Sequence, residues 1–224
     1  MTSAAQPATA AWATAGRIAR NHPTLPPTGP MTPAVQRLWL AGLQLFAERG
    51  FHGTTVRDLA KALDIKPASL YSLITSKDQL LADLVLLGHQ QHALIVEQSL
   101  EDAPDDPASQ LRAFVRGHVI THARWPMLAV VANNELHCLS AELAAPSLQI
   151  RGRTAETLQV IIERGRRAKI FLVKDTFLAT AAIAAMGMRI ASWYGDDSPY
   201  SEDHLADSYA DLAMRAVDYH ETES

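Results

Sequence analysis

The chain has 224 residues, of which 48% are apolar and 20% are charged. This composition excludes collagen, a coiled-coil rod and a fully disordered chain, and the length is sufficient for one or two domains with a buried core. The formal charge of −4 also argues, for the chain as a whole, against a highly basic nucleic-acid binder.

Cysteine content and hydropathy point to a cytoplasmic protein. A single cysteine, Cys138, cannot form an internal disulfide or a thiolate metal cage, so a reducing compartment is expected. The first thirty residues lack the continuous apolar core of a secretory signal. The longest apolar run, Phe177 to Met188, ends at Arg189, well short of the roughly 20 residues that cross a bilayer. We therefore expect no membrane segment.

The charge is unevenly distributed along the chain. Residues 1–30 hold two basic residues and no acid, and residues 31–80 hold six basic and four acidic residues. The remaining residues, 81–224, hold twelve basic and twenty acidic residues. The net charges are therefore +2, +2 and −8, and a contact with a polyanion is expected near the N-terminus.

Residues 1–30 are rich in Ala, Thr and Pro and show no sustained period, which predicts a flexible arm. Its Arg17 and Arg20 could reach DNA, although a disordered tail is the simpler interpretation. A first helix follows, with Thr32 as the N-cap, Pro33 at the first helical position and Gly50 as the terminator.

Two short helices are expected next, with about three residues between them. The first begins after Thr55, where Asp58 completes a capping box, and ends near Asp64. The second has Pro67 at its first position and turns Leu70 inward. Two helices joined in this way form a helix-turn-helix, whose second helix enters the DNA major groove. At the turn, Asp64 is expected to adopt a left-handed conformation at moderate cost.

A long helix is predicted from the Ser-x-x-Gln motif at Ser76 toward Leu100, and the clearest break in the chain follows at residues 101–107. Later helices are expected over residues 109–123, 126–139, 141–168 (a broken helix), 175–194 and 202–219. The fold is therefore expected to be all-α with about nine helices. It divides into the arm (1–30), a three-helix unit with the helix-turn-helix (31–81) and a second helical domain (82–224).

One stretch within residues 31–85 resembles the N-terminal domain of the TetR family of transcriptional repressors: FAERGFHGTTVRDLAKALDIKPASLYSLITSKDQLL. The matching positions are Phe46, Gly50, Phe51, Thr54, Thr55, Leu59, Ala60, Ile65, Leu70, Tyr71, Ser76 and Lys77. The resemblance implies a homodimeric repressor, not an enzyme, that binds a palindromic operator and is released by a small-molecule effector. The chain departs from the family pattern at Asp64, Lys66, Ser72, Leu73 and Ile74, which puts operator preference in doubt.

The resemblance also assigns DNA contacts. It implies phosphate contacts by Thr55, Tyr71 and Lys77 and base contacts by Lys66, Pro67, Ala68, Ser69 and Ser72. Thr55 and Lys77 lie where helices begin, and free amides and the helix dipole favour phosphate there. Lys66 could donate to guanine O6 and N7, and Ala68 could meet a thymine methyl group. The alternatives are a core position for Tyr71 and a solvated side chain for Lys66.

For residues 82–224 the resemblance implies a ligand-binding and dimerisation domain that pairs through its last two helices, 175–194 and 202–219. Candidate ligand-binding residues are large or polar groups on otherwise apolar helices: Phe114, His118, His122, Trp125, Met127, Asn134, His137, Met186 and Trp193. His118 and His122 are four residues apart and could bind a metal, but no third ligand has clear spacing. We therefore expect ordinary polar or packing roles, no metal and no cofactor.

The C-terminal stretch WYGDDSPYSEDHLADSYADLAMRAV resembles a TetR branch that controls lipid, steroid or aromatic-acid breakdown and responds to acyl-CoA thioesters. Under this resemblance, basic side chains would contact the CoA phosphates: Arg151, Arg153, Arg166, Arg167 and Lys169. A solvated basic helix face is the simpler interpretation. A nonpolar drug-like ligand and a protein partner are the alternatives to this effector. The sequence has no phosphate-binding glycine loop, nucleophile elbow or metal triad, which argues against an enzyme.

Overall fold

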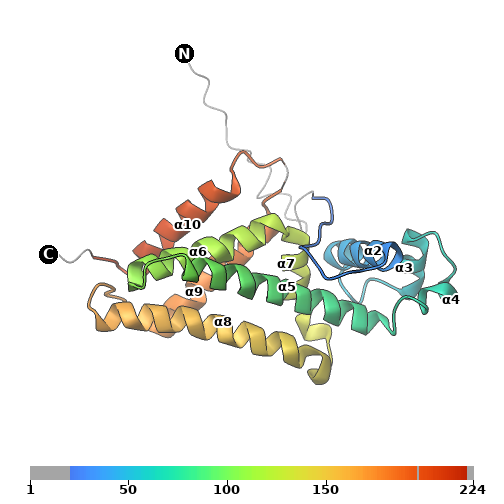
Figure 1. Ribbon diagram of the computed structural model, residues 1–224, viewed down its shortest axis with the longest axis horizontal. Helices are drawn as coiled ribbons and strands as arrows, with labels where there is room; N and C mark the ends of the chain where they lie inside the picture. Colours follow the sequence, from blue (N-terminus) through green and yellow to red (C-terminus); the bar gives the residue numbers. More distant parts are fainter. Residues whose placement is uncertain (1–20, 196, 221–224) are drawn as a thin grey trace, which may run out of the picture.

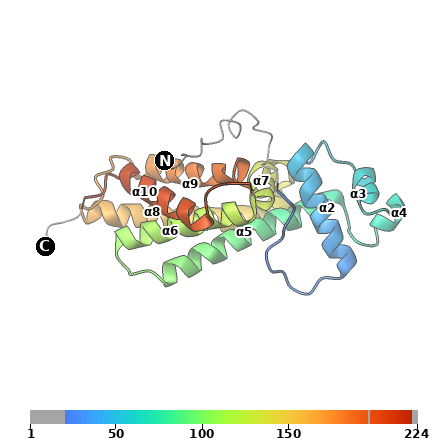
Figure 2. The same ribbon diagram turned by 90° about the horizontal axis from the view of Figure 1, so that it is seen from above.

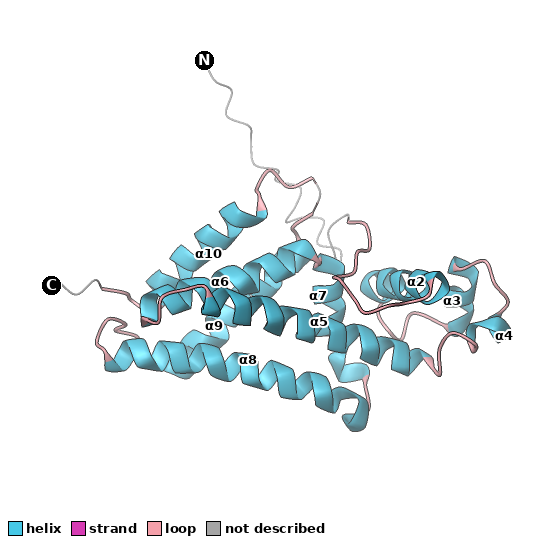
Figure 3. Cartoon of the chain, in the orientation of Figure 1, coloured by secondary structure: helices cyan, strands magenta, loops and turns pink. Residues whose placement is uncertain are grey.

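The computed structural model describes residues 21–195 and 197–220, and their regular secondary structure is helical (Figure 3). The helices are α2 (Pro33–Arg49), α3 (Val56–Ala62), α4 (Pro67–Leu70), α5 (Lys77–Glu101), α6 (Pro107–Arg124), α7 (Pro126–Asn134), α8 (Ala141–Arg167), α9 (Thr176–Met188) and α10 (Glu202–Ala216). Two 3₁₀ segments accompany them, η1 (Leu136–Cys138) and η2 (Arg189–Ser192). Nine α-helices and no strand in these ranges confirm the all-α prediction.

Helices α2 to α4 and the first turns of α5 form one end of the molecule, here called the head (Figures 1 and 2). The rest of α5 and helices α6 to α10 form the body. Helix α5 runs from one part into the other. The helix-turn-helix thus projects from one end of an elongated helical bundle.

The predicted helix starts of the head are confirmed. The Thr32 hydroxyl accepts a hydrogen bond from the Val35 amide, and Gly50 ends α2. Thr55 and Asp58 form a reciprocal capping box at α3. The Ser76 hydroxyl accepts a hydrogen bond from the Gln79 amide at 3.0 Å, and this cap begins α5. These caps satisfy amides that have no partner within their own helix.

The turn between α3 and α4 takes the predicted conformation. Asp64 has a φ of 56°, which lies in the left-handed region. This reversal allows the Ile65 amide to donate to the Ala60 carbonyl at 3.0 Å. The Arg37 guanidinium from α2 donates to the Leu63 carbonyl at 3.2 Å. The end of α3 is therefore capped by backbone and side chain together.

Two large hydrophobic clusters and one of three residues are found among the described residues, and α5 belongs to both large ones. Its Leu80, Leu81 and Leu84 are fully buried in the head cluster, whereas Val96 is buried in the body cluster. Helix α7 also reaches the head cluster, through Met127 and other residues. Head and body are therefore joined by apolar packing as well as by the chain.

A buried hydrogen bond adds to this junction. The Glu135 carboxylate, at the end of α7, accepts from the Phe51 amide at 3.0 Å. Both residues are buried. A hydrogen bond to a charged acceptor is stronger than one between neutral groups. It holds the loop between α2 and α3 against the body.

Helices α6 and α10 pack along one another and are linked by ion pairs. The Arg112 guanidinium contacts Asp211 at 2.6 Å, and Arg124 contacts Glu202 at 2.7 Å. Arg116 pairs with two acids of α10 in the same way. All of these side chains are at least partly exposed, so each pair contributes little, about 0–1 kcal/mol. Their main effect is to place part of the acidic charge of the body opposite arginines.

The prediction of a broken helix over residues 141–168 is wrong. Helix α8 is continuous over Ala141–Arg167 with Pro146 inside it. The proline removes a single backbone hydrogen bond, and it lies on an exposed position near the start of the helix. A long inner face, including Leu158 and Ile162, is buried and holds the helix together.

The apolar run near the C-terminus forms a shorter helix than expected. Helix α9 ends at Met188, and the 3₁₀ segment η2 continues the chain as far as Ser192. Across the part of the chain that the structure covers, none of the helices combines the length and apolar character that a bilayer span requires.

Residues 1–20, including Arg17 and Arg20, lie outside the described residues. The rest of the predicted arm, residues 21–30, has no regular secondary structure, and its last four residues are exposed. The Asn21 side chain donates to the Tyr194 carbonyl at 3.1 Å, and Leu25 packs against the head cluster.

Candidate DNA-binding surface and ligand cavity

Helix α4 presents an exposed row of residues at the far end of the head (Figure 1). Leu70 is fully buried and anchors the helix in the head cluster. The predicted base-facing residues are all exposed: Lys66, Pro67, Ala68, Ser69 and Ser72. Tyr71 is 60% exposed and is therefore not a core aromatic. The six exposed side chains thus lie on α4 and at its two ends, around the buried Leu70.

Thr55 lies exposed at the start of α3, where its hydroxyl is already in use. It donates to the Asp58 carboxylate at 2.6 Å, and the Thr55 amide donates to the same carboxylate at 2.8 Å. These hydrogen bonds hold the pKa of Asp58 below its ordinary value. A phosphate at this helix end would therefore meet the free amides of the first turn of α3 sooner than the Thr55 hydroxyl.

Lys77 has an intramolecular role that the sequence did not reveal. Its ammonium donates to the carbonyls of Phe51 at 2.9 Å and Thr54 at 2.7 Å. It also lies 3.9 Å from the centre of the Phe51 ring, within the range of a cation–π contact. The side chain thus ties the start of α5 to the loop before α3, and only one of its three N–H groups remains for a phosphate.

A cavity of about 170 Å³ lies among helices α5 to α9. Four of the nine predicted ligand-binding residues line it: Phe114, His118, His122 and Trp125. Most of the remaining wall is apolar and includes Leu128, Leu158 and Met188. The volume is of the order that accommodates a benzene-sized group. A concave, mainly apolar site with a few polar groups is the usual form of a small-molecule site.

The other five predicted residues lie elsewhere. Met127 is buried in the head cluster, and Met186 and Trp193 pack against the body cluster. Asn134 and His137 are exposed at a surface depression beside η1. Whether an apolar side chain faces the core or the cavity depends on the rotation of its helix about the helix axis. The helical period of the sequence does not specify that rotation.

Several lining residues were missed by the sequence interpretation. They include His89 and His92 from α5 and Asn133 from α7. Arg151 of α8 also lines the cavity, and the sequence had suggested it only as a contact for a CoA phosphate. The spacing of His89 and His92, three residues apart, places them on one helix face. That spacing was a usable signal, but the sequence does not show that this face meets the His118 and His122 pair.

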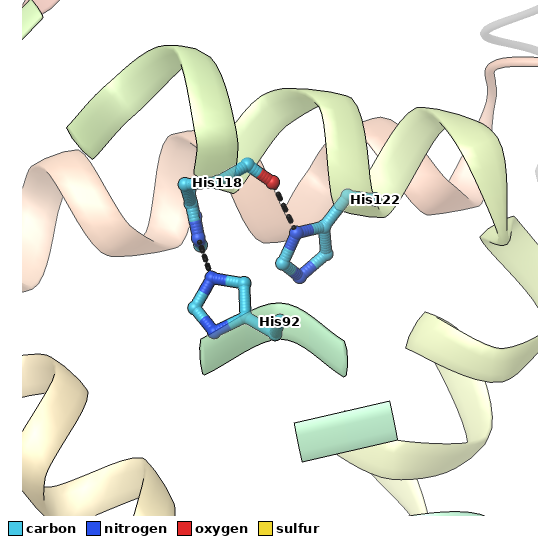
Figure 4. Close-up of side chains that lie close together, drawn as sticks. All are labelled: His92, His118 and His122. Atoms are coloured by element: carbon cyan, nitrogen blue, oxygen red, sulfur yellow. Dashed lines mark hydrogen bonds between the residues drawn. The ribbon is translucent and has the colours of Figure 1, made fainter. Parts of the chain in front are cut away.

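Three histidines of this wall face one another (Figure 4). His92 Nε2 lies 2.7 Å from His118 Nδ1. His118 Nε2 donates to the Ala184 carbonyl at 3.0 Å, and His122 Nδ1 donates to the His118 carbonyl at 2.7 Å. Because a carbonyl only accepts, these contacts assign the proton of His118 to Nε2 and that of His122 to Nδ1.

Burial keeps these imidazoles neutral. It lowers the pKa of His118 to about 3 and that of His122 to about 4, and it holds the pKa of His92 well below its ordinary value. The nearby histidines act in the same direction on His92 and His118. The cluster therefore supplies uncharged nitrogen donors and acceptors at neutral pH.

His89 adds an unsatisfied polar atom to the same wall. It is buried, and its Nε2 has no hydrogen-bond partner. Burial, followed by the charge of Arg151, lowers its pKa to about 4. A buried nitrogen without a partner loses its hydration without compensation. A polar atom of a ligand in the cavity would restore the missing hydrogen bond.

Helix α9 closes the cavity next to His118, and Gly187 makes this approach possible. A Cβ atom at position 187 would meet the His118 ring. The backbone of α9 is therefore in direct contact with the imidazole, and a larger residue would have to displace it. By contrast, Gly152 of α8 has open space where a Cβ would lie.

These two glycines provide a matched test of the cavity wall. Gly187→Ala should lower the free energy of unfolding, because overpacking costs about 1–3 kcal/mol and exceeds the gain of about 1 kcal/mol in helix propensity. Gly152→Ala should raise it by about 0.5–1 kcal/mol. Urea unfolding followed by circular dichroism measures both changes. Equal stabilisation by the two substitutions would contradict the contact between α9 and His118.

Comparison with known protein families gives matches to both parts of the chain. The profile described as "Bacterial regulatory proteins, tetR family" matches residues 40–84. The profile described as "Tetracyclin repressor-like, C-terminal domain" matches residues 104–217, which is half of the chain. The first contains α3 and α4, and the second contains most of the cavity-forming helices.

Individual proteins are similar to this chain in sequence and fold, or in fold alone. The HTH-type transcriptional repressor DhaR of Mycobacterium sp. (strain GP1) is 29% identical over 164 residues, which cover 73% of this chain and 80% of DhaR. A bacterial regulatory protein in the tetR family from Rhodococcus RHA1 is 30% identical, with a TM-score of 0.76 over 85% of this chain and 100% of its own. AibR, solved in complex with isovaleryl coenzyme A and operator DNA, has a TM-score of 0.71 at 20% identity and covers 84% of this chain and 100% of its own.

Proposed function

Because the chain belongs to the TetR family of bacterial regulators, which are DNA-binding transcription factors and not enzymes, we propose how its parts perform this task. As a homodimeric repressor in the cytoplasm, it binds a palindromic operator and is released by a small molecule. Residues 31–81 bind DNA, and residues 82–224 bind the effector and dimerise. The observation that carries this proposal is the exposed row on α4.

The α4 surface suits a major groove. Ala68, Ser69 and Ser72 are small, so the helix can approach base edges closely, and Lys66 supplies a donor for guanine. Tyr71 leaves most of its side chain in solvent although Leu70 beside it is fully buried. An exposed tyrosine combines an apolar ring with a hydroxyl donor, and both would be used against a DNA backbone.

We expect Tyr71→Ala to weaken operator binding at least about tenfold, because a lost hydrogen bond and ring contact amount to roughly 1.4 kcal/mol or more. Fluorescence anisotropy with a mapped operator at fixed salt measures the affinity. Tyr200→Ala, which removes a 43% exposed tyrosine that lies just before α10 and outside the helix-turn-helix, is the control and should bind normally. An unchanged affinity for Tyr71→Ala would refute this docking surface.

Dimerisation is proposed through α9 and α10. A repressor that binds a two-fold operator needs two-fold symmetry. Residues Phe177 and Leu178 of α9 are 66% and 62% exposed, and Leu212 of α10 is 43% exposed. By contrast, Ala179 and Ile183 are buried in the core of the chain itself. The pairing surface is therefore the outward face of α9, which is rich in alanine, with the adjoining part of α10.

Leu178→Glu is expected to convert the dimer into a monomer, because each subunit would place a charge in the apolar contact. The substitution leaves the subunit core intact, since Leu178 is mostly exposed. Light scattering coupled to size-exclusion chromatography gives the mass. Leu148→Glu on α8, at a position that is 51% exposed, is the control. A dimer that persists in Leu178→Glu would place the interface elsewhere.

The effector is proposed to insert a small apolar group into the cavity, with an anionic part near Arg151. A short acyl group attached to coenzyme A fits this description, as does the ligand with which AibR was solved. Of the five basic residues considered for CoA phosphates, only Arg151 lines the cavity. Arg166 lies fifteen residues further along α8, roughly 22 Å away along the helix axis. Arg151 is therefore the residue proposed to meet the anion.

Thermal-shift measurements with isovaleryl-CoA and free isovalerate test this effector class, because a bound ligand stabilises the folded state. We expect the thioester to raise the Tm of the wild-type protein and to have a smaller effect on Arg151→Gln. Arg153→Gln, which alters an exposed neighbour on the same helix, should respond like wild type. Absence of a shift with this and other thioesters would refute the acyl-CoA proposal and favour a nonpolar ligand or a protein partner.

A further inference from the structure

The three-histidine cluster described above has the composition and spacing of a metal site. His92 comes from α5, and His118 and His122 come from successive turns of α6. One nitrogen from each ring lies within 4.8 Å of the others (Figure 4). We propose that His92, His118 and His122 bind a transition metal ion of the Zn²⁺ type, with the remaining coordination position open to the cavity.

The hydrogen bonds around the cluster prepare it for this role. His118 and His122 each donate one ring N–H to a backbone carbonyl, at 3.0 Å and 2.7 Å. Metal-binding histidines usually donate their second nitrogen in this way, which selects the tautomer and orients the ring. His118 Nδ1 and His122 Nε2 are therefore left with lone pairs. His92 Nε2 already faces the first of these nitrogens.

Metal binding requires the three rings to adjust their separations. Tetrahedral Zn–N bonds of about 2.0–2.1 Å place two ligand nitrogens roughly 3.3 Å apart, whereas His92 and His118 are 2.7 Å apart and share a hydrogen bond. The metal would replace that proton as the link between the rings. It would also displace the weaker contact of the Asn133 amide with His122 Nε2, at 3.3 Å. The three ligand nitrogens lie within 4.8 Å of one another, so the His122 ring would have to approach the other two by up to about 1.5 Å.

The donor set indicates which ions and ligands would bind. Imidazole nitrogens suit Zn²⁺, Cu²⁺, Fe²⁺ and Ni²⁺, and not Mg²⁺ or Ca²⁺. Among the residues that the structure covers, no cysteine, carboxylate or further histidine joins the group. Three protein ligands and an open position form the type of site that takes a water or an exogenous donor. Since all three histidines line the cavity, that donor would come from the cavity.

Charge favours an anionic donor at the open position. Three neutral imidazoles do not offset the charge of a divalent ion, and Arg151 adds another positive charge to the same wall. An anionic oxygen or sulfur atom, such as a carboxylate or thiolate, would reduce the cost of burying this charge. Assignment of that donor to an effector rests on the proposed function, whereas metal binding itself does not.

The first experiment measures Zn²⁺ binding to the chelator-treated full-length protein by isothermal titration calorimetry, without DNA. One ion per chain is expected. His92→Gln and His118→Gln should each bind at least about tenfold more weakly, since even the loss of an outer-shell partner commonly costs 10- to 100-fold. His137→Gln is the matched control, because this exposed histidine lies beside Cys138 and outside the cavity.

Absence of Zn²⁺ binding by the wild-type protein would overturn the inference. Unchanged binding by both cluster variants, or loss of binding in His137→Gln, would also overturn it, because the ion would then lie at another site. A protein that binds its operator normally but takes up no Zn²⁺ would refute the metal site and leave the proposed function intact.

A second measurement does not depend on the folding of the variants. Wild-type protein loaded with Co²⁺ should show the intense visible absorption of a four-coordinate ion, and addition of azide should change that spectrum by occupying the open position. An octahedral-type spectrum of low intensity would contradict the three-histidine site. A four-coordinate spectrum that azide does not change would contradict the open position.

Discussion

The burial of helix α5 in two hydrophobic cores is the constraint on which the rest of the structure depends. One end of the helix places leucines in the head cluster, and the other end places Val96 in the body cluster. Between them, His89 and His92 face the cavity. A single rigid element therefore connects the DNA-binding surface, the cavity wall and the body. A change in the cavity that moves α5 also moves the head, because no flexible linker separates them.

The cavity combines an apolar interior with a polar wall whose groups are mostly satisfied internally. Backbone carbonyls of Ala184 and His118 accept from two of the histidines, and the third histidine completes the chain of contacts. His89 is the exception, with its unpartnered nitrogen. Buried polar groups that are fully paired make a site rigid, whereas an unpaired one provides a gain for a ligand. The hydrogen-bonded histidines His92, His118 and His122 thus form a rigid part of the wall, whereas a ligand could supply the missing partner of His89.

Local features of the fold could be predicted from the sequence. Thr32, Thr55 and Ser76 begin helices because each side chain accepts a hydrogen bond from the amide three residues later. Such a cap depends on nearby sequence and not on distant packing. Asp64 adopts its left-handed conformation for the same local reason. The continuity of α8 through Pro146 could not be predicted, because it depends on a buried face that forms only when other helices pack against it.

The two candidate sites differ in the same way: the DNA-binding surface depends on local sequence, whereas the ligand cavity depends on tertiary packing. The candidate DNA-binding residues at α4 follow one another in sequence, and Leu70 is the one buried residue among Lys66 to Ser72. The ligand cavity instead joins residues from five helices, and their packing decides which side chains line it. Met127, for example, is buried in the head cluster and not in the cavity wall. His92 lies 26 residues before His118, and only the packing of α5 on α6 makes them neighbours. The periodicity of a sequence identifies the apolar face of a helix, but it does not identify the neighbouring helix on which that face packs.

The contact of Lys77 with two carbonyls has a mechanical consequence. Because its ammonium holds both Phe51 and Thr54, the first turn of α5 and the loop before α3 move together. The head then moves as a rigid unit with α5, and its internal geometry does not change when α5 tilts. Helix α5 has 25 residues. Its length of about 37 Å means that a tilt of about 5° at the far end shifts the head by roughly 3 Å, which is comparable with the rise of one base pair.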